Sequence, residues 1–213
     1  MRHERLQRRP WHYMTPVRKT TTLHAVVLAA GASSRFGSPK QLVRLDGHSL
    51  LQRAVTHTSE LLGAAVTVVL GAHAAEIAET MPPGSAGIII NRDWQEGIAS
   101  SIRAGVLRLP GACDGVMLVL ADQPLVGSET LRRLMTAWRG HPRQIIASRY
   151  AGVTGVPAVF PRWCFSDLIA LRGDAGARVV IRRYADHVIK LDHPEAAVDI
   201  DYPEDLLELS SSG

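Results

Sequence analysis

The chain has 213 residues, 46% of them hydrophobic and 21% charged, a composition typical of one globular domain. Residues 1–22 hold six of the 24 basic and one of the 20 acidic residues, so the other 18 basic and 19 acidic residues nearly balance. This balance argues against nucleic acid as a partner of the folded part. We expect 1–22 to form a flexible basic extension, with a nucleic-acid or membrane arm as the alternative, and 23–213 to form the domain.

The sequence contains neither a recognisable secretion signal nor a membrane span. Residues 1–22 lack the apolar core of a signal peptide, and no run approaches about 18 consecutive apolar residues. Cys113 and Cys164 are too few for a disulfide framework, and free cysteines suit a reducing compartment. We therefore expect a cytoplasmic protein without membrane contact.

Apolar segments of strand length alternate along the chain with amphipathic segments of helix length. The expected strands are 25–30, 65–70, 87–90, 115–120 and 144–148, and the expected helices are 49–62, 74–81, 100–109 and 129–138, the last capped by Ser128. This alternation predicts an α/β fold, a Rossmann-like three-layer sandwich around a mostly parallel sheet. Ligands bind such sheets at the carboxyl ends of the strands.

The first expected strand runs directly into a glycine-rich, cationic loop. Gly31 lets the backbone approach an anion, and Arg35 and Lys40 supply positive charge, a pattern typical of phosphate binding. The spacing matches neither the Walker A pattern nor the dinucleotide fingerprint. The alternative is an ordinary strand-to-helix turn whose arginine and lysine are exposed to solvent.

Carboxylates follow two other parts of the predicted sheet. Asp122 lies two residues beyond the strand 115–120, where it could hold Mg²⁺ together with substrate phosphate oxygens or cap the following turn. Asp199 and Asp201 have the spacing that places both on one side of an extended segment. One of them could complete a metal site, or both could be charges favoured near a helix beginning at Pro203.

Three more segments are candidates for ligand contact. Ser100 and Ser101 open the helix after the third strand and could either read a nucleotide base or cap the helix. Residues 173–178, GDAGAR, could close over a second anionic substrate or form a corner between helices. Residues 155–157, GVP, predict a turn near the site.

The segment LAAGASSRFGSPKQL resembles the L-A-x-G-x-S-x-R-M-G-x-x-K loop of the MobA-like nucleotidyltransferases. The segments NRDWQEGIASSIRAG, VLADQPLV, LRGDAGARVVI and DIDYPEDL follow in the family's order. Over residues 23–209 the chain looks most like the MocA-type molybdenum cofactor cytidylyltransferases. Three departures are Phe36 for Met, Val156 where histidine is frequent, near the expected acceptor site, and Tyr202 for Thr.

This resemblance implies transfer of CMP from CTP to the terminal phosphate of molybdopterin cofactor, with Mg²⁺ or Mn²⁺ as the cofactor and release of pyrophosphate. Ala30, which is glycine in the guanylyltransferase branch, favours CTP over GTP. A molybdenum hydroxylase is the expected partner enzyme. The alternatives are a transferase that uses GTP or a sugar-phosphate acceptor, and a non-catalytic carrier of molybdenum cofactor.

Each expected site residue has one or more roles. Catalysis is assigned to Arg35, Lys40 and Asp122; nucleotide binding to Ala29, Ala30, Gly31, Arg35, Lys40, Gly97 and Ser101; metal binding to Asp122 and Asp201; and acceptor binding to Gly155, Asp174 and Arg178.

Overall fold

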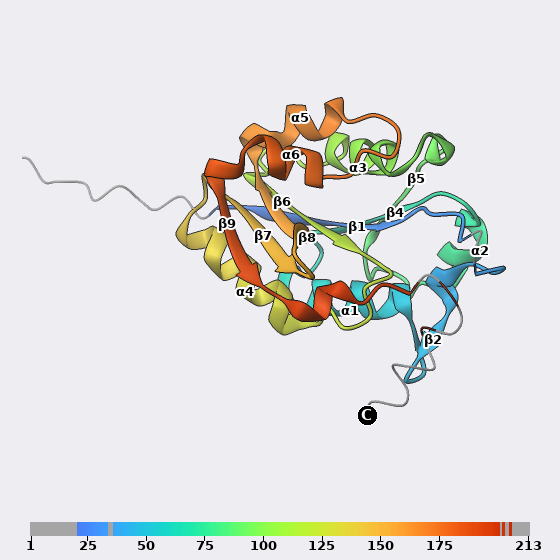
Figure 1. The fold of residues 1–213 in the computed structure, drawn as a ribbon. Coiled ribbons are helices and arrows are strands. Elements are labelled where there is room, and N and C mark those ends of the chain that lie inside the picture. Colours follow the sequence, from blue (N-terminus) through green and yellow to red (C-terminus); the bar gives the residue numbers. More distant parts are fainter. Residues whose placement is uncertain (1–20, 34–35, 201, 203–204, 206–213) are drawn as a thin grey trace, which may run out of the picture.

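The computed structural model describes residues 21–33, 36–200, 202 and 205, which form three layers (Figure 1). Within them the main sheet has seven strands in the order β5-β4-β1-β6-β8-β7-β9. The strands are β1 (Leu23–Ala29), β4 (Val66–Leu70), β5 (Gly87–Ile90), β6 (Gly115–Leu120), β7 (Ile145–Tyr150), β8 (Val153–Pro161) and β9 (Val188–Asp192). Only β8 runs antiparallel to its neighbours among these strands, so the predicted α/β sandwich with a mostly parallel sheet is confirmed.

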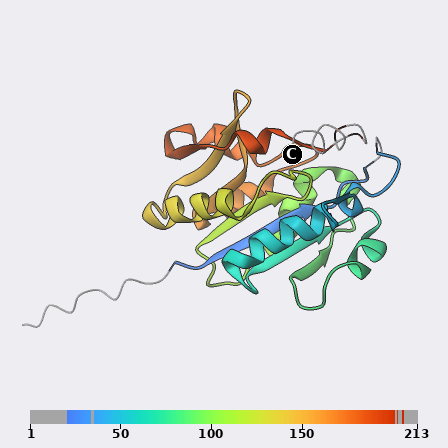
Figure 2. The same cartoon turned by 90° about the horizontal axis from the view of Figure 1, so that it is seen from below.

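Helices cover both faces of the sheet (Figures 1 and 2). One face carries α1 (Leu50–Leu62) and α4 (Ser128–Gly140), and the other carries α3 (Ile98–Leu107), α5 (Phe165–Ala170) and α6 (Arg178–Arg183). The short helix α2 (Ala74–Glu79) follows β4. The buried apolar residues form two clusters, one on each face, because the central strands are apolar on both sides.

Short elements complete the connections. A small hairpin of β2 (Arg44–Leu45) and β3 (His48–Ser49) leads into α1, where Ser49 forms a capping box with Gln52. The 3₁₀ turns are Lys40–Leu42, Trp94–Glu96, Arg162–Cys164, Ala185–His187 and Pro194–Ala197. No helix in the described ranges has the length and apolarity needed to cross a bilayer.

The strand order creates a switch point beside β1. From β1 the chain moves outward to β4 and β5, and it then returns to β6 on the opposite side of β1. The loops after β1 and β6 therefore leave the same edge of the sheet in different directions, which opens a crevice for ligands. The loop after β1, which the sequence predicts to bind phosphate and which we call the phosphate-type loop, lies at this edge, and so does Asp122.

Two local predictions are wrong. Ser128 is the first residue of α4 rather than its cap; Gly127 takes the cap position without a side-chain hydrogen bond. Residues 155–157 lie within β8, and the turn that precedes β8 is formed by Ala151 and Gly152, both with positive φ. Proline is tolerated in β8 because the pairing with β7 is irregular there, with a register shift between Ala147 and Ser148.

Candidate functional site

The loop after β1 is held in shape by the side chain of Gln41, which is only 3% exposed. Its Nε2 donates to the carbonyl oxygens of Ala29, at 3.0 Å, and Gly31, at 2.8 Å. The Ser33 hydroxyl accepts the backbone N–H of Lys40 at 3.0 Å and donates to Oε1 of Gln41 at 3.3 Å. The start and end of the loop are therefore tied together by protein groups.

Lys40 and Asp122 form an ion pair across the switch point, with Nζ 2.6 Å from Oδ2. The lysine also donates to the carbonyl oxygen of Ile200 at 3.3 Å. The second carboxylate oxygen of Asp122, Oδ1, is buried and has no hydrogen-bond partner among the described residues. A buried anionic oxygen without a donor is unfavourable, and a divalent cation would satisfy it. Asp122 therefore fits a ligand of Mg²⁺ or Mn²⁺.

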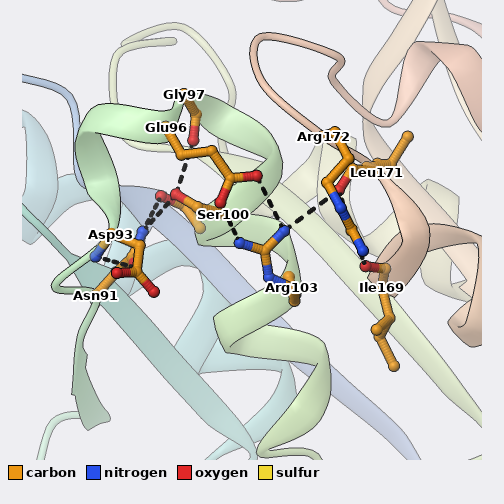
Figure 3. A network of polar contacts seen from close by, with 10 residues as sticks. Asn91, Asp93, Glu96, Gly97, Ser100, Arg103, Ile169, Leu171 and Arg172 are labelled. Carbon is orange, nitrogen blue, oxygen red and sulfur yellow. Dashed lines mark hydrogen bonds and ion pairs between the residues drawn. The ribbon is translucent and has the colours of Figure 1, made fainter.

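Asn91, directly after β5, organises the opposite wall (Figure 3). Its Nδ2 donates to the hydroxyl oxygens of Ser100, at 2.8 Å, and Ser101, at 3.0 Å, and its Oδ1 accepts the N–H of Asp93. Ser100 in turn donates to the carbonyl of Gly97, which is itself the N-cap of α3. Neither serine caps the helix, and the Ser101 hydroxyl accepts from Asn91 while its own proton has no acceptor in the described chain.

Gly97 joins this wall to the turn between α5 and α6. Its φ is +110°, and a Cβ there would lie 2.4 Å from Oδ1 of Asp174 and 2.5 Å from the carbonyl oxygen of Gly173. The Gly173 carbonyl also accepts the N–H of Ala99 at 3.1 Å. Glycine is required here both by the backbone conformation and by the close approach.

An ion pair reinforces the same contact (Figure 3). Arg103 on α3 pairs with Glu96, and its Nη1 also donates to the carbonyl oxygen of Leu171 at 3.3 Å. The hydrogen bond from Arg103 lowers the pKa of the Glu96 carboxyl below its ordinary value. The wall after β5 and the turn after α5 are thus connected by both backbone and side-chain contacts.

These walls enclose a first cavity of about 360 Å³ at the switch point. The predicted residues that line it are Ala29, Ala30, Gly31, Lys40, Gly97, Ser101 and Asp122. A second cavity of about 420 Å³ adjoins it, with Leu28, Ile98, Leu120 and Asp174 lining both. The second cavity is lined by all three residues predicted for the acceptor: Gly155, Asp174 and Arg178. Arg35 and Asp201 lie outside the described residues.

The residue-by-residue assignment omitted three side chains that shape these cavities. Gln41 and Asn91 hold the walls of the first, and Gln123, which is 4% exposed, lines the second. Asn91 and Gln123 are amides that follow directly or closely on an apolar strand, a signal that could have selected them. The bracing role of Gln41 has no comparable local signal.

Residues 25–188 match the family model of the MobA-like NTP transferase domain. The chain belongs to this family of nucleotidyltransferases. The nicotine blue oxidoreductase of Paenarthrobacter nicotinovorans is 29% identical, over 86% of this chain and 94% of its own. The purine catabolism protein PucB of Bacillus subtilis is 28% identical, over 86% and 93%.

Solved structures are also similar to this chain over most of its length. The crystal structure of Rv0371c from Mycobacterium tuberculosis has a TM-score of 0.76 and 28% identity, and covers 90% of this chain and 98% of its own. A second crystal structure of Rv0371c, in complex with manganese, has a TM-score of 0.73. The family-level resemblance predicted from the loop motif is therefore confirmed.

Proposed function

We propose that the protein transfers CMP from CTP to the terminal phosphate of a molybdopterin-type acceptor and releases pyrophosphate. The observation that carries this proposal is the junction of the two cavities just after β6. Asp122 lines the first cavity, and the next residue, Gln123, lines the second. A carboxylate between the loop after β1 and a separate pocket suits transfer of a nucleotidyl group between two anionic ligands.

In this reaction an oxygen of the acceptor phosphate attacks the α-phosphorus of CTP. The bond from that phosphorus to the bridging oxygen breaks, and its electron pair leaves with pyrophosphate. Because the attacking oxygen is already anionic, no strong general base is needed. The work of the protein is alignment and neutralisation of charge, with Lys40 and Arg35 assigned to the triphosphate.

Asp122 would hold the divalent ion, with Asp201 as the proposed second carboxylate. When bound, such an ion neutralises negative charge on the phosphates as they react. The unpartnered Oδ1 of Asp122 and the manganese complex of Rv0371c support this assignment. Lys40, now paired with the other oxygen of Asp122, is close enough to exchange that contact for a phosphate.

The family resemblance assigns CTP through Ala30, and Gly71 packs directly behind that residue. A Cβ added at Gly71 would lie 2.5 Å from the carbonyl oxygen of Ala30 and 2.8 Å from its Cβ, so nothing larger fits behind this wall. The same Cβ would lie 2.6 Å from that of Trp94, which also lines the cavity.

The test is a pyrophosphate-release assay with molybdenum cofactor, crossed against CTP, GTP, ATP and UTP in the presence of Mg²⁺. We expect turnover with CTP and a loss of about 10³-fold or more in Asp122→Ala. Asp186→Ala is the control, since Asp186 is exposed and lines neither cavity. Undiminished turnover in Asp122→Ala would contradict the metal assignment.

The other functions give different results in the same assay. Turnover with GTP, or with a sugar phosphate in place of the cofactor, would show that the protein is a nucleotidyltransferase with other substrates. Cofactor binding without pyrophosphate release would indicate a carrier that delivers the cofactor to a molybdenum hydroxylase. Because one relative is named an oxidoreductase, the absorbance of a reduced nicotinamide dinucleotide is followed in parallel, and its oxidation without pyrophosphate release would refute the transferase proposal.

A further inference from the structure

The second cavity contains a buried polar atom that lacks a partner in the described chain. The side chain of Gln123 donates from Nε2 to the carbonyl oxygen of Ala196 at 2.8 Å, and this bond fixes the orientation of the amide. Its Oε1 is buried and accepts no hydrogen bond within the described ranges. Gln123 is 4% exposed and lines the cavity. A buried acceptor without a donor is unfavourable, so a ligand that supplies a donor is favoured.

Apolar side chains form part of the lining of this cavity. Leu120, Ile102 and Val156 line the same cavity. Tyr150 also lines the cavity, but its hydroxyl donates to the carbonyl oxygen of Val156 at 2.9 Å. Gln123 therefore contributes to the lining of this cavity a side chain of fixed orientation whose buried acceptor oxygen is unpartnered in the described chain, and a ligand N–H would satisfy that oxygen.

The rim of the cavity adds charge. Arg178 and Arg182 lie one turn apart on α6, line the cavity and are exposed, and neither forms an ion pair or hydrogen bond among the described residues. Asp174 and Asp199 line the cavity as well. Because the charges are mixed, the site suits a mostly apolar ligand with one anionic group better than a polyanion.

We infer that Gln123 determines acceptor specificity: its Oε1 accepts a hydrogen bond from a ring N–H of a planar heterocycle whose anionic substituent pairs with Arg178 or Arg182. A heterocyclic amide is the kind of group that is apolar over most of its surface and still presents an N–H. The inference rests on the proposed function for the identity of this pocket as the acceptor site. The hydrogen bond from a ligand N–H to Gln123 can be tested by binding alone, without an assay of turnover.

The test compares two pteridine probes that differ in their N–H groups. Lumazine-6-carboxylate has ring N–H donors, whereas 1,3-dimethyllumazine-6-carboxylate has methyl groups in their place. Fluorescence titration of the full chain should give about 3- to 10-fold tighter binding of the first probe, the effect of one neutral hydrogen bond. Gln123→Met should abolish this preference, and Arg178→Gln should weaken both probes by the same factor.

Gln52→Met is the matched control. Gln52 also donates from Nε2 to a backbone carbonyl, that of Thr80 at 3.1 Å, but it lines neither cavity. Its substitution should cost stability without changing the preference between the probes. If Gln123→Met fails to fold, as judged by circular dichroism, the two probes on the wild-type protein decide the matter.

The inference is overturned if the wild-type protein binds the two probes equally or binds neither, or if Gln123→Met keeps the preference. Failure of the proposed function looks different. A clear preference for the N–H probe without pyrophosphate release would leave the specificity assignment in place and remove the transferase. Pyrophosphate release without any preference between the probes would support the transferase and refute the specificity assignment of Gln123.

Discussion

The two cavities differ in how their polar groups are satisfied. In the first, Gln41, Asn91 and Lys40 are hydrogen-bonded or paired with other protein groups, although Oδ1 of Asp122 has no partner among the described residues. In the second, Oε1 of Gln123 and the guanidinium of Arg178 have no partner among the described residues. Under the proposed function, most of the nucleotide cavity is therefore built before its ligand arrives, whereas the acceptor cavity would receive part of its polar contacts from its ligand. Preorganisation of this kind reduces the entropic cost of binding on the first side only.

This contrast determines how substitutions should act. A change in the first cavity removes a bond that shapes the protein, so stability and nucleotide binding should fall together. A change at an exposed residue of the second, such as Arg178, should alter ligand binding with little effect on stability.

Among the changes that test this contrast, Gly97→Ala should have the largest effect. The added Cβ would lie 2.4 Å from Asp174 Oδ1 at a φ of +110°, so the wall after β5 and the turn after α5 must separate. We expect a loss of about 1–3 kcal/mol in the free energy of unfolding, from backbone strain. CTP binding, measured by calorimetry, should weaken about 10-fold or more. Gly140→Ala is the control, because its Cβ would meet no atom within 4 Å; equal behaviour of the two variants would contradict the prediction.

Gln41→Leu should have the next largest effect. The change keeps the volume of the side chain but leaves the carbonyl oxygens of Ala29 and Gly31 without their donor. Urea unfolding should show a loss of about 1–3 kcal/mol, the usual cost of unpaired buried polar groups, and CTP affinity should fall with it. Gln144→Leu, at a partly exposed glutamine without a side-chain bond in the described chain, should change neither. Loss of stability with unchanged CTP affinity would show that the loop is shaped by other contacts.

Arg178→Gln should affect only the acceptor side. We expect the KM for the acceptor to rise about 3- to 10-fold, with stability within about 0.5 kcal/mol of wild type, as for most surface substitutions. The KM for CTP should not move. Since the arginine is exposed, 0.5 M salt should reduce the difference between variant and wild type. Arg139→Gln, on α4, is the control. If Arg178→Gln raised the KM for CTP as much as the KM for the acceptor, the two cavities would not bind separate substrates.

The smallest predicted effect is a dependence on pH. Burial lowers the pKa of His193 below its ordinary 6.5, Arg133 lowers it further, and Glu195 and Asp192 raise it. The unfolded chain therefore binds more protons than the folded chain as the pH falls through 6.5. The stability contributed by neutral His193 is complete above this pH and is lost as the pH falls below 6.5 and through the lowered pKa of the folded chain.

His193 supports β8, whose Gly155 and Val156 line the second cavity, through Ser148. Its Nδ1 lies 2.9 Å from the Ser148 hydroxyl, which donates to the carbonyl of Pro157 in β8. Melting temperatures from pH 7 to 5 should fall, and His193→Asn should reduce that fall. His24 and His57, whose pKa values burial also lowers, should account for the remainder. As the pH is lowered, probe binding in the second cavity should weaken before CTP binding does. The opposite order would refute the role of His193 in supporting β8.

The sequence predicts the parallel half of the sheet well. The strands β5 and β6 have the predicted bounds, because continuous apolar runs bounded by turns are a local signal. The hairpin of β2 and β3 was not predicted, although Asp46 and Gly47, both with positive φ, are a recognised turn pair. β8, β9, α5 and α6 were not predicted either, because their packing depends on distant partners.

By itself the sequence determined the family, the phosphate-type loop and the position of Asp122 after a strand. Each of these depends on residues that are near in the chain, so local patterns are sufficient. Only the tertiary structure decided that β8 lies antiparallel between β6 and β7, and that Gln123 bonds to Ala196, 73 positions away. The physical reason is that such pairings are selected by packing and burial of the whole chain, and these leave no periodic signal in the segments themselves.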